Sequence, residues 1–462
     1  MVSLNTFFPE LLYMVLDEIQ ARDDLLSLAS TCSAFKALIV PNRLEYHTIS
    51  TSVYYPALWN HLISRPYLAR NIRELVLCDD YTSESTNAPR WRLPRVLGRP
   101  GSPSTSGKIG DVNRKELAAA LRLMALVSKV DIRLTRGVET SGQDNVALVI
   151  SNLPSLVDLK LVVSDLAILN NAGGGTFVSR DPAYPLWKLS HLRSINLDFN
   201  VWDDDLWPPF LAVLLRSSDI EELHVPQFVT CNFSAFAAFR KCRFPSLKRL
   251  YISPSIYPSF DEDVFLFLKA HPGIEILSWS AYGACYTVPC AILPSLKRLL
   301  NCNPATVSGL IHNNPDASVP LESIEDLDLD PVILPAFDRI NPATFRRLSM
   351  QFLDSFATLR MLSVRFPALV EIELPRRGPW DDNRRVFMQL KKALLRPWFN
   401  DLAMPHIDDV LVLFPRAEVV KGVRCTGLSY GQNREHPKVV QVLTALKARY
   451  PRLRRVNTWR LC

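Results

Sequence analysis

The chain has 462 residues, of which 48% are hydrophobic, and a formal net charge of +7. This length exceeds what one hydrophobic core usually organises, so a repetitive architecture or several units are expected. No window offers the roughly 18 uninterrupted apolar residues of a membrane-spanning helix, and we expect no signal peptide because no basic stretch precedes the first apolar run.

The N-terminal residues 7–41 predict three short helices. Apolar residues recur there at helical spacing, and a proline stands in the first turn, where its missing N–H is harmless. Asp23 or Asp24 can cap the second helix and Ser33 the third, which ends at Pro41. So short a unit cannot bury all of its apolar surface alone, and it must pack against the rest of the chain or a partner.

These helices resemble an F-box, of the kind found in fungal F-box-like proteins. The matching anchors are Phe8-Pro9, Glu10-Leu11-Leu12, Asp24-Leu25-Leu26, and Leu28 with Cys32. The chain departs from the pattern at Phe8, where leucine is usual, and at Ala34-Phe35, where an aromatic residue, often tryptophan, is common. The alternative is an N-terminal cap that merely covers the end of a repeat array.

The resemblance implies that residues 1–48 form a domain that docks on a Skp-type adaptor and, through it, on a cullin-based ubiquitin ligase. The residues implied in adaptor binding are Phe8, Pro9, Leu12, Leu16, Ile19, Leu25, Leu28 and Cys32.

A short phrase recurs along the rest of the chain: a turn, often with proline, followed by apolar-x-x-apolar-x-apolar. Period-2 alternation inside each phrase predicts a short strand. The equivalent apolar positions are Leu159, Ile195, Leu223, Leu250, Leu277, Leu299, Leu327, Leu348 and Ile372. Most of their spacings fall in the range of leucine-rich repeats, about 20 to 29 residues, and helical patterns such as 205–215 and 261–270 lie between them.

The predicted fold is therefore α/β. We expect residues 49–462 to form a curved leucine-rich-repeat-like solenoid, with a parallel sheet on the concave face and helices on the convex face. The alternative is an ordinary parallel α/β domain. Three segments interrupt the pattern: residues 79–110, rich in Ser, Pro, Gly and Arg, predict a disordered insertion, and residues 170–181 and 375–383 predict loops.

Motifs of enzyme chemistry are missing from the sequence. It contains no phosphate-binding Gly-x-x-x-x-Gly-Lys loop, no Gly-x-Ser-x-Gly elbow and no His-Glu-x-x-His zinc motif. Cys285 and Cys290 lack the second pair that a zinc site needs, and the nine scattered cysteines suggest reduced thiols. We expect no enzyme, cofactor or metal; an enzyme on an α/β solenoid is the alternative of a different class.

In leucine-rich repeats, the residues that alternate with the core positions line the concave face. Applied here, this rule predicts a substrate-binding surface that consists of Arg249, Tyr251, Arg298, Asp326, Asp328, Glu371 and Glu373. Mixed charge blocks suit a protein partner, whereas a nucleic-acid groove would need a basic stripe interleaved with aromatic residues.

The sequence thus predicts the substrate-recognition subunit of a Skp/cullin/F-box ubiquitin ligase, in the cytoplasm or the nucleus, with no nucleic acid or membrane as a partner. The alternative is a leucine-rich-repeat interaction scaffold without ligase function.

Overall fold

A computed structural model describes residues 9–19, 21–53, 55–78, 92–97, 112–134, 146–163, 181–199, 206–225, 239–252, 258–279, 293–312, 320–329, 333–353, 356–374, 406–423, 425, 437–457 and 459–460. The chain divides into two compact units, Met1–Leu247 and Lys248–Cys462, and each is described by itself. Most of residues 79–110, 170–181 and 375–383 lie outside the described residues.

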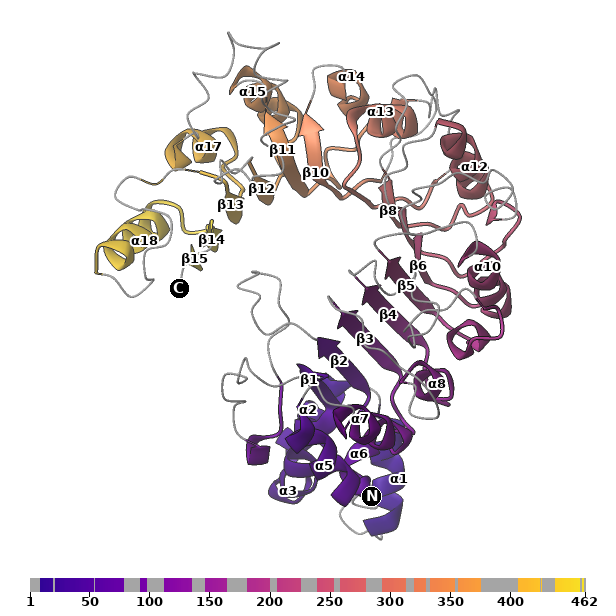
Figure 1. The fold of residues 1–462 in the computed structure, drawn as a ribbon. Helices are drawn as coiled ribbons and strands as arrows, with labels where there is room; N and C mark the ends of the chain where they lie inside the picture. The colour runs from indigo at the N-terminus through magenta and orange to yellow at the C-terminus, as the bar shows by residue number, and fades with distance from the viewer. Residues whose placement is uncertain are drawn as a thin grey trace, which may run out of the picture. The chain divides into compact units, whose positions relative to one another are not determined.

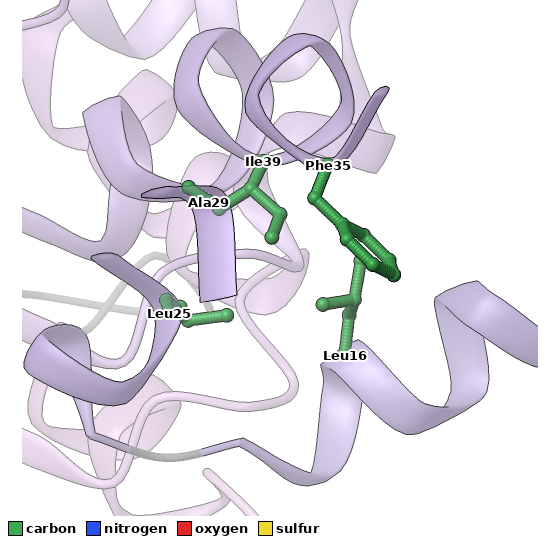
Figure 2. Packing of buried hydrophobic residues seen from close by; sticks show 5 residues of the cluster. All are labelled: Leu16, Leu25, Ala29, Phe35 and Ile39. Carbon is green, nitrogen blue, oxygen red and sulfur yellow. The ribbon is translucent and has the colours of Figure 1, made fainter. Parts of the chain in front are cut away.

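Three helices stand at the N-terminus of the first unit: α1 (Pro9–Glu18), α2 (Arg22–Thr31) and α3 (Ser33–Ile39). Their buried core consists of Leu16, Leu25, Ala29, Phe35 and Ile39, and Figure 2 shows the side chains of Leu16 and Phe35 pointing toward each other. The three helices lie where the sequence predicts them.

The ends of these helices differ from the prediction. Cys32, not Ser33, caps α3, because its Sγ accepts a hydrogen bond from the backbone N–H of Phe35 at 3.5 Å. Ala21 stands at the N-cap of α2, with Asp23 and Asp24 in its first turn. Acidic side chains there interact favourably with the positive end of the helix dipole. Pro41 does not end the helical run, since the π-helical turn η2 (Val40–Leu44) and the short α4 (Glu45–His47) follow.

Six parallel strands follow one another in chain order in the first unit: β1 (Thr48–Ser52), β2 (Glu74–Cys78), β3 (Lys129–Leu134), β4 (Asp158–Val163), β5 (Ser194–Phe199) and β6 (Glu222–Val225). The helical segments between them are α5 (Pro56–Ser64), α6 (Pro66–Ala69), η3 (Arg95–Leu97), α7 (Val112–Arg122), α8 (Val146–Ser151), η5 (Pro185–Lys188) and α10 (Trp207–Arg216). Figure 1 shows α7, α8 and α10 along one side of these strands.

The second unit repeats this plan. Its parallel strands are β7 (Arg249–Ile252), β8 (Ile276–Trp279), β9 (Arg298–Leu300), β10 (Ser323–Leu329), β11 (Arg347–Leu353), β12 (Glu371–Glu373), β13 (Val419–Lys421) and β14 (Arg455–Val456). A last strand, β15 (Trp459–Arg460), pairs antiparallel with β14. The helices are α12 (Pro258–Lys269), α13 (Pro304–His312), α14 (Leu334–Phe337), α15 (Phe356–Arg365), α17 (Ile407–Leu413) and α18 (Pro437–Arg449).

One apolar residue of each strand occupies the same register position and is at most 1% exposed. In the first unit these residues are Ile49, Leu75, Val130, Leu159, Ile195 and Leu223. In the second unit they are Leu250, Leu277, Leu299, Ile324, Leu348, Ile372, Val420 and Val456. The structure therefore confirms an α/β chain with parallel strands, and within each unit it pairs the predicted repeat positions, with one exception in β10.

That exception is a correction of register in β10. The sequence aligned Leu327 with Leu299 and Leu348, but the structure pairs Ile324 with both of them. The ladder between β10 and β11 is irregular after Ile324, and Asp326 has a positive φ of 58° there. The bulge lets Ile324 and Leu327 both be buried although three positions separate them. Glu325, directly after Ile324, therefore takes the position that the prediction gave to Asp328, and Ser323 takes the position that it gave to Asp326.

Candidate binding surfaces

Helix α1 presents a second apolar stripe that its own bundle does not bury. While Leu16 packs into the core, Leu11, Met14 and Val15 are 45%, 64% and 48% exposed. Spacings of three and four residues place these three side chains on one side of the helix, and we call them the apolar face of α1. Leu26 of α2 is also exposed, at 49%. Apolar surface gathered on one helix side is typical of a protein contact.

Most of the residues predicted for adaptor binding lie in or against the three-helix core and not on this face. Leu16 and Leu25 are core residues, and Leu12, Ile19, Leu28 and Cys32 are half-buried against that core. Pro9 begins α1, and Phe8 lies outside the described residues. Met14 and Val15 are not among the residues that were predicted to bind the adaptor. The signal was present in the run Leu11–Leu16, which is apolar all round its helix and so cannot be buried by one small bundle.

Asp17 ties α1 to Arg43 of η2 and to Arg73, which directly precedes β2. Its carboxylate lies 2.7 Å from Nη1 of Arg43, whose Nη2 donates to the Tyr13 carbonyl at 3.2 Å. Its carbonyl accepts a hydrogen bond from Nη2 of Arg73 at 3.0 Å. The Arg43 and Arg73 side chains are only 8% and 4% exposed. Burial lowers the pKa of Arg73, and the charge of Asp17 opposes that shift. These bonds fix α1, and with it the apolar face, to η2 and to the residue that directly precedes β2.

A second candidate surface crosses the strands of the second unit. Its residues, which we call the charge ladder, are Arg298, Glu325, Arg347, Glu371, Glu373 and Lys421. From β9 to β13, strands that carry a basic residue of the ladder alternate with strands that carry acidic ones. These side chains flank the buried register positions, so they lie on the sheet face opposite the core.

Close contacts join the ladder from end to end. Glu325 Oε1 lies 2.7 Å from Nη2 of Arg298 and 3.3 Å from Nη1 of Arg347. Arg347 Nη2 reaches Oε2 of Glu371 at 2.7 Å. Lys421 Nζ then bridges Glu371 at 3.2 Å and Glu373 at 2.7 Å. Because each charge of the ladder has an opposite neighbour, a partner would meet a patterned surface with little net charge.

The predicted substrate residues separate into two places. Arg298, Glu371 and Glu373 belong to the charge ladder, and Asp326 adjoins it, since it accepts a hydrogen bond from Ser349 Oγ at 3.4 Å. Arg249 and Tyr251 lie on β7, which β8 separates from β9. For Asp328 only the backbone is described, where it pairs with Phe352.

Glu325 and Lys421 are not among the predicted binding residues. Glu325 could not be predicted because of the bulge. With Leu327 in the core, a regular strand would place Asp326, and not Glu325, on the face opposite the core. Lys421 follows the long segment 375–405, after which the repeat spacing could not be traced.

The first unit carries a smaller ion-pair group. Lys129 Nζ on β3 lies 3.8 Å from Glu74 of β2 and 3.4 Å from Asp158 of β4. Burial acts to lower the pKa of Lys129, but the charges of Asp158 and Glu74 outweigh it and raise the pKa. Cross-strand pairing of opposite charges is thus common to the exposed sheet faces of both units.

Among the described residues, no group of three His, Cys, Asp or Glu side chains is placed to hold a metal ion. Burial raises the pKa of the Cys302 thiol to about 12 and that of Cys425 to about 11, and a protonated thiol is a poor nucleophile. Within the described parts of the chain, no helix is long and apolar enough to cross a membrane.

No protein-family model and no curated protein matches the chain. A proposal about its function therefore rests on the residues and the two candidate surfaces.

Proposed function

We propose that this protein is the substrate-recognition subunit of a Skp/cullin/F-box ubiquitin ligase. The N-terminal helices bind the Skp-type adaptor, and the strand repeats, arranged as a leucine-rich-repeat-like solenoid, bind a protein substrate. The chain itself performs no chemistry. It raises the effective concentration of the substrate near a ubiquitin-charged enzyme, in the cytoplasm or the nucleus.

The observation that carries the proposal is the apolar face of α1. It belongs to the segment that resembles an F-box, and it is exposed although the three-helix core beneath it is complete. Burying a large apolar side chain contributes about 1.5–3 kcal/mol when the burial is complete, so Leu11, Met14 and Val15 could supply much of a protein contact. The Asp17 bonds would then hold the adaptor and the repeats in a fixed geometry.

The repeats support the second half of the proposal. Strands β2 to β4 of the first unit and β9 to β13 of the second present side chains of alternating charge on the face opposite the core. Such a surface gives orientation and specificity to a protein contact more than affinity.

The alternative is an interaction scaffold without ligase function. The charge ladder favours it as much as it favours a substrate receptor, because the ladder does not involve the N-terminal helices. Binding of the adaptor separates the two functions.

The test is a binding assay between the full chain and a purified Skp-type adaptor. Leu11→Glu/Met14→Glu should weaken binding by more than about tenfold, because it puts two charges into an apolar contact. Met361→Glu/Val364→Glu is the matched control, since it changes two exposed apolar residues with the same spacing on α15, 51% and 84% exposed. The proposal fails if the wild-type chain does not bind the adaptor, or if both double variants bind as well as wild type.

A further inference from the structure

The last repeat carries an unusual concentration of positive charge. Residues 437–462 contain seven Lys and Arg residues and no Asp or Glu, while the whole chain has a net charge of +7. Four of these residues fall within seven positions, Arg449, Arg452, Arg454 and Arg455. We call residues 449–455 the arginine segment.

The arginine segment is held in place by its backbone. It runs from the end of α18, which buries Val439, Leu443 and Leu446, to the start of β14. The Leu453 N–H donates to the Tyr450 carbonyl at 3.0 Å, and the N–H groups of Arg454 and Arg455 both donate to the Glu418 carbonyl, at 2.7 and 3.1 Å. Leu453 is buried while all four arginines are exposed. The segment thus presents its arginines on a fixed frame.

Two carboxylates of the neighbouring repeat pair with only two of the four arginines of this segment. Arg449 Nη1 lies 3.2 Å from Asp408, and Arg454 Nε lies 2.9 Å from Glu418. Within the described parts of the chain, Arg452 and Arg455 have no ion-pair partner. The charge ladder differs, because there every basic residue contacts an acid. Two positive charges of the arginine segment, those of Arg452 and Arg455, are therefore left without an acidic neighbour among the described residues.

We propose that the arginine segment binds an acidic, Asp- and Glu-rich segment of a partner protein. The contacts with Asp408 and Glu418 show that carboxylates fit beside these guanidinium groups, and arginine offers several N–H donors in a geometry that matches carboxylates. The two unpaired arginines are three positions apart in the sequence, on either side of Arg454, and both are exposed.

A single-stranded nucleic acid fits this segment less well. Binding of that kind depends on aromatic side chains that stack on the bases. Tyr450 is the one aromatic residue of the arginine segment; its hydroxyl donates to Asp408 at 2.9 Å, and Arg449 lies over its ring at 5.4 Å. The hydroxyl and the ring of Tyr450 therefore already have partners within the chain, and the ring is less available for stacking on a base. The inference does not depend on adaptor binding, so it is tested with the full chain alone.

The experiment measures fluorescence anisotropy of a labelled poly-glutamate peptide titrated with the full chain at physiological salt. Saturable binding is expected, and Arg452→Glu/Arg455→Glu should weaken it by about tenfold or more. The control Lys188→Glu/Arg193→Glu changes the same charge on two exposed residues of the first unit, where Arg193 precedes β5 as Arg454 precedes β14. It should bind within about twofold of wild type.

Thermal melting checks that each variant is folded, and Arg452→Gln/Arg455→Gln replaces the charge reversal if that variant unfolds. The inference is overturned if the wild-type chain shows no saturable binding, or if the control loses as much affinity as the test variant. It is also overturned if a single-stranded oligonucleotide of equal charge binds more tightly than the peptide through the same two arginines.

Discussion

Glu325 and Asp326 are neighbours in sequence, but their carboxyl pKa values shift in opposite directions. Burial acts to raise the pKa of Glu325, but the hydrogen bonds and charges of Arg298 and Arg347 outweigh it and lower the pKa. Partial burial raises the pKa of Asp326, and the charges of Glu373 and Glu325 add to that shift. The difference arises because Glu325 lies between two arginines, whereas Asp326 is partly buried near the carboxylates of Glu373 and Glu325.

These directions predict opposite pH effects on stability. The lowered pKa of Glu325 gives stability that is complete above its ordinary pKa, 4.5, and is lost as pH falls through the folded value. The raised pKa of Asp326 means that stability is lost as pH rises from its ordinary value, 3.8, through the folded value. At pH 7, Glu325→Gln should therefore lower the free energy of unfolding and Asp326→Asn should raise it, each by less than about 1 kcal/mol because solvent screens both sites.

Urea denaturation at pH values between 7 and 4 measures both effects. Asparagine tolerates the positive φ at position 326, so Asp326→Asn tests charge without backbone strain. Both differences from wild type should shrink toward pH 4. If the two variants change stability in the same direction at pH 7, the electrostatic assignment is wrong.

At the level of elements, the repeats could be predicted because apolar residues alternate within each phrase and recur at nearly regular spacing. The bulge could not, because Ile324 and Leu327 are both apolar and either one fits the repeat position. Nor could the exposed side of α1, since an apolar run such as Leu11–Leu16 does not say which stripe faces inward. Tertiary packing decides both features, and it cannot be deduced from a local sequence pattern.

Strand β1 was not predicted either, because its sequence Thr48–Ser52 is largely polar. All five residues are nevertheless buried. Arg92 forms an antiparallel bridge with Ser50, with both backbone hydrogen bonds at 3.0 Å, and Tyr55 Oη donates to the Leu97 carbonyl at 3.3 Å. Part of the predicted disordered insertion, residues 92–97, therefore covers the edge of β1.

A covered edge protects a sheet from pairing with another chain. Arg92→Pro removes the N–H that donates to Ser50, so it should uncover β1 and increase concentration-dependent self-association. Arg92→Ala keeps that N–H and should behave like wild type, which separates the backbone effect from the loss of charge. Sedimentation velocity at several concentrations measures the difference. If both variants stay as monomeric as wild type, then residues 92–97 do not protect the edge.

At the scale of the whole molecule, both units are built from contacts between successive repeats. A carbonyl before one strand accepts two N–H groups from the next repeat, as when Arg346 accepts from Val370 and Glu371 at 2.8 and 3.0 Å. The buried register position of each strand packs beside that of its neighbour in the chain. In such proteins, stability is approximately the sum of repeat terms and nearest-neighbour terms, so a local defect should remain local.

Leu159→Ala and Leu348→Ala test this locality, because the two leucines hold the same register position, one in each unit, and are each 1% exposed. Each change should cost about 2–5 kcal/mol of local stability through lost burial and a cavity. In hydrogen exchange measured by mass spectrometry, Leu159→Ala should speed exchange in β3, β4 and β5, and Leu348→Ala in β10, β11 and β12. Each variant serves as the control for the other, because the strands of the other unit should keep their wild-type rates. Faster exchange throughout the chain in both variants would mean that the repeats unfold as one cooperative body, and additive repeat energetics would then not describe this protein.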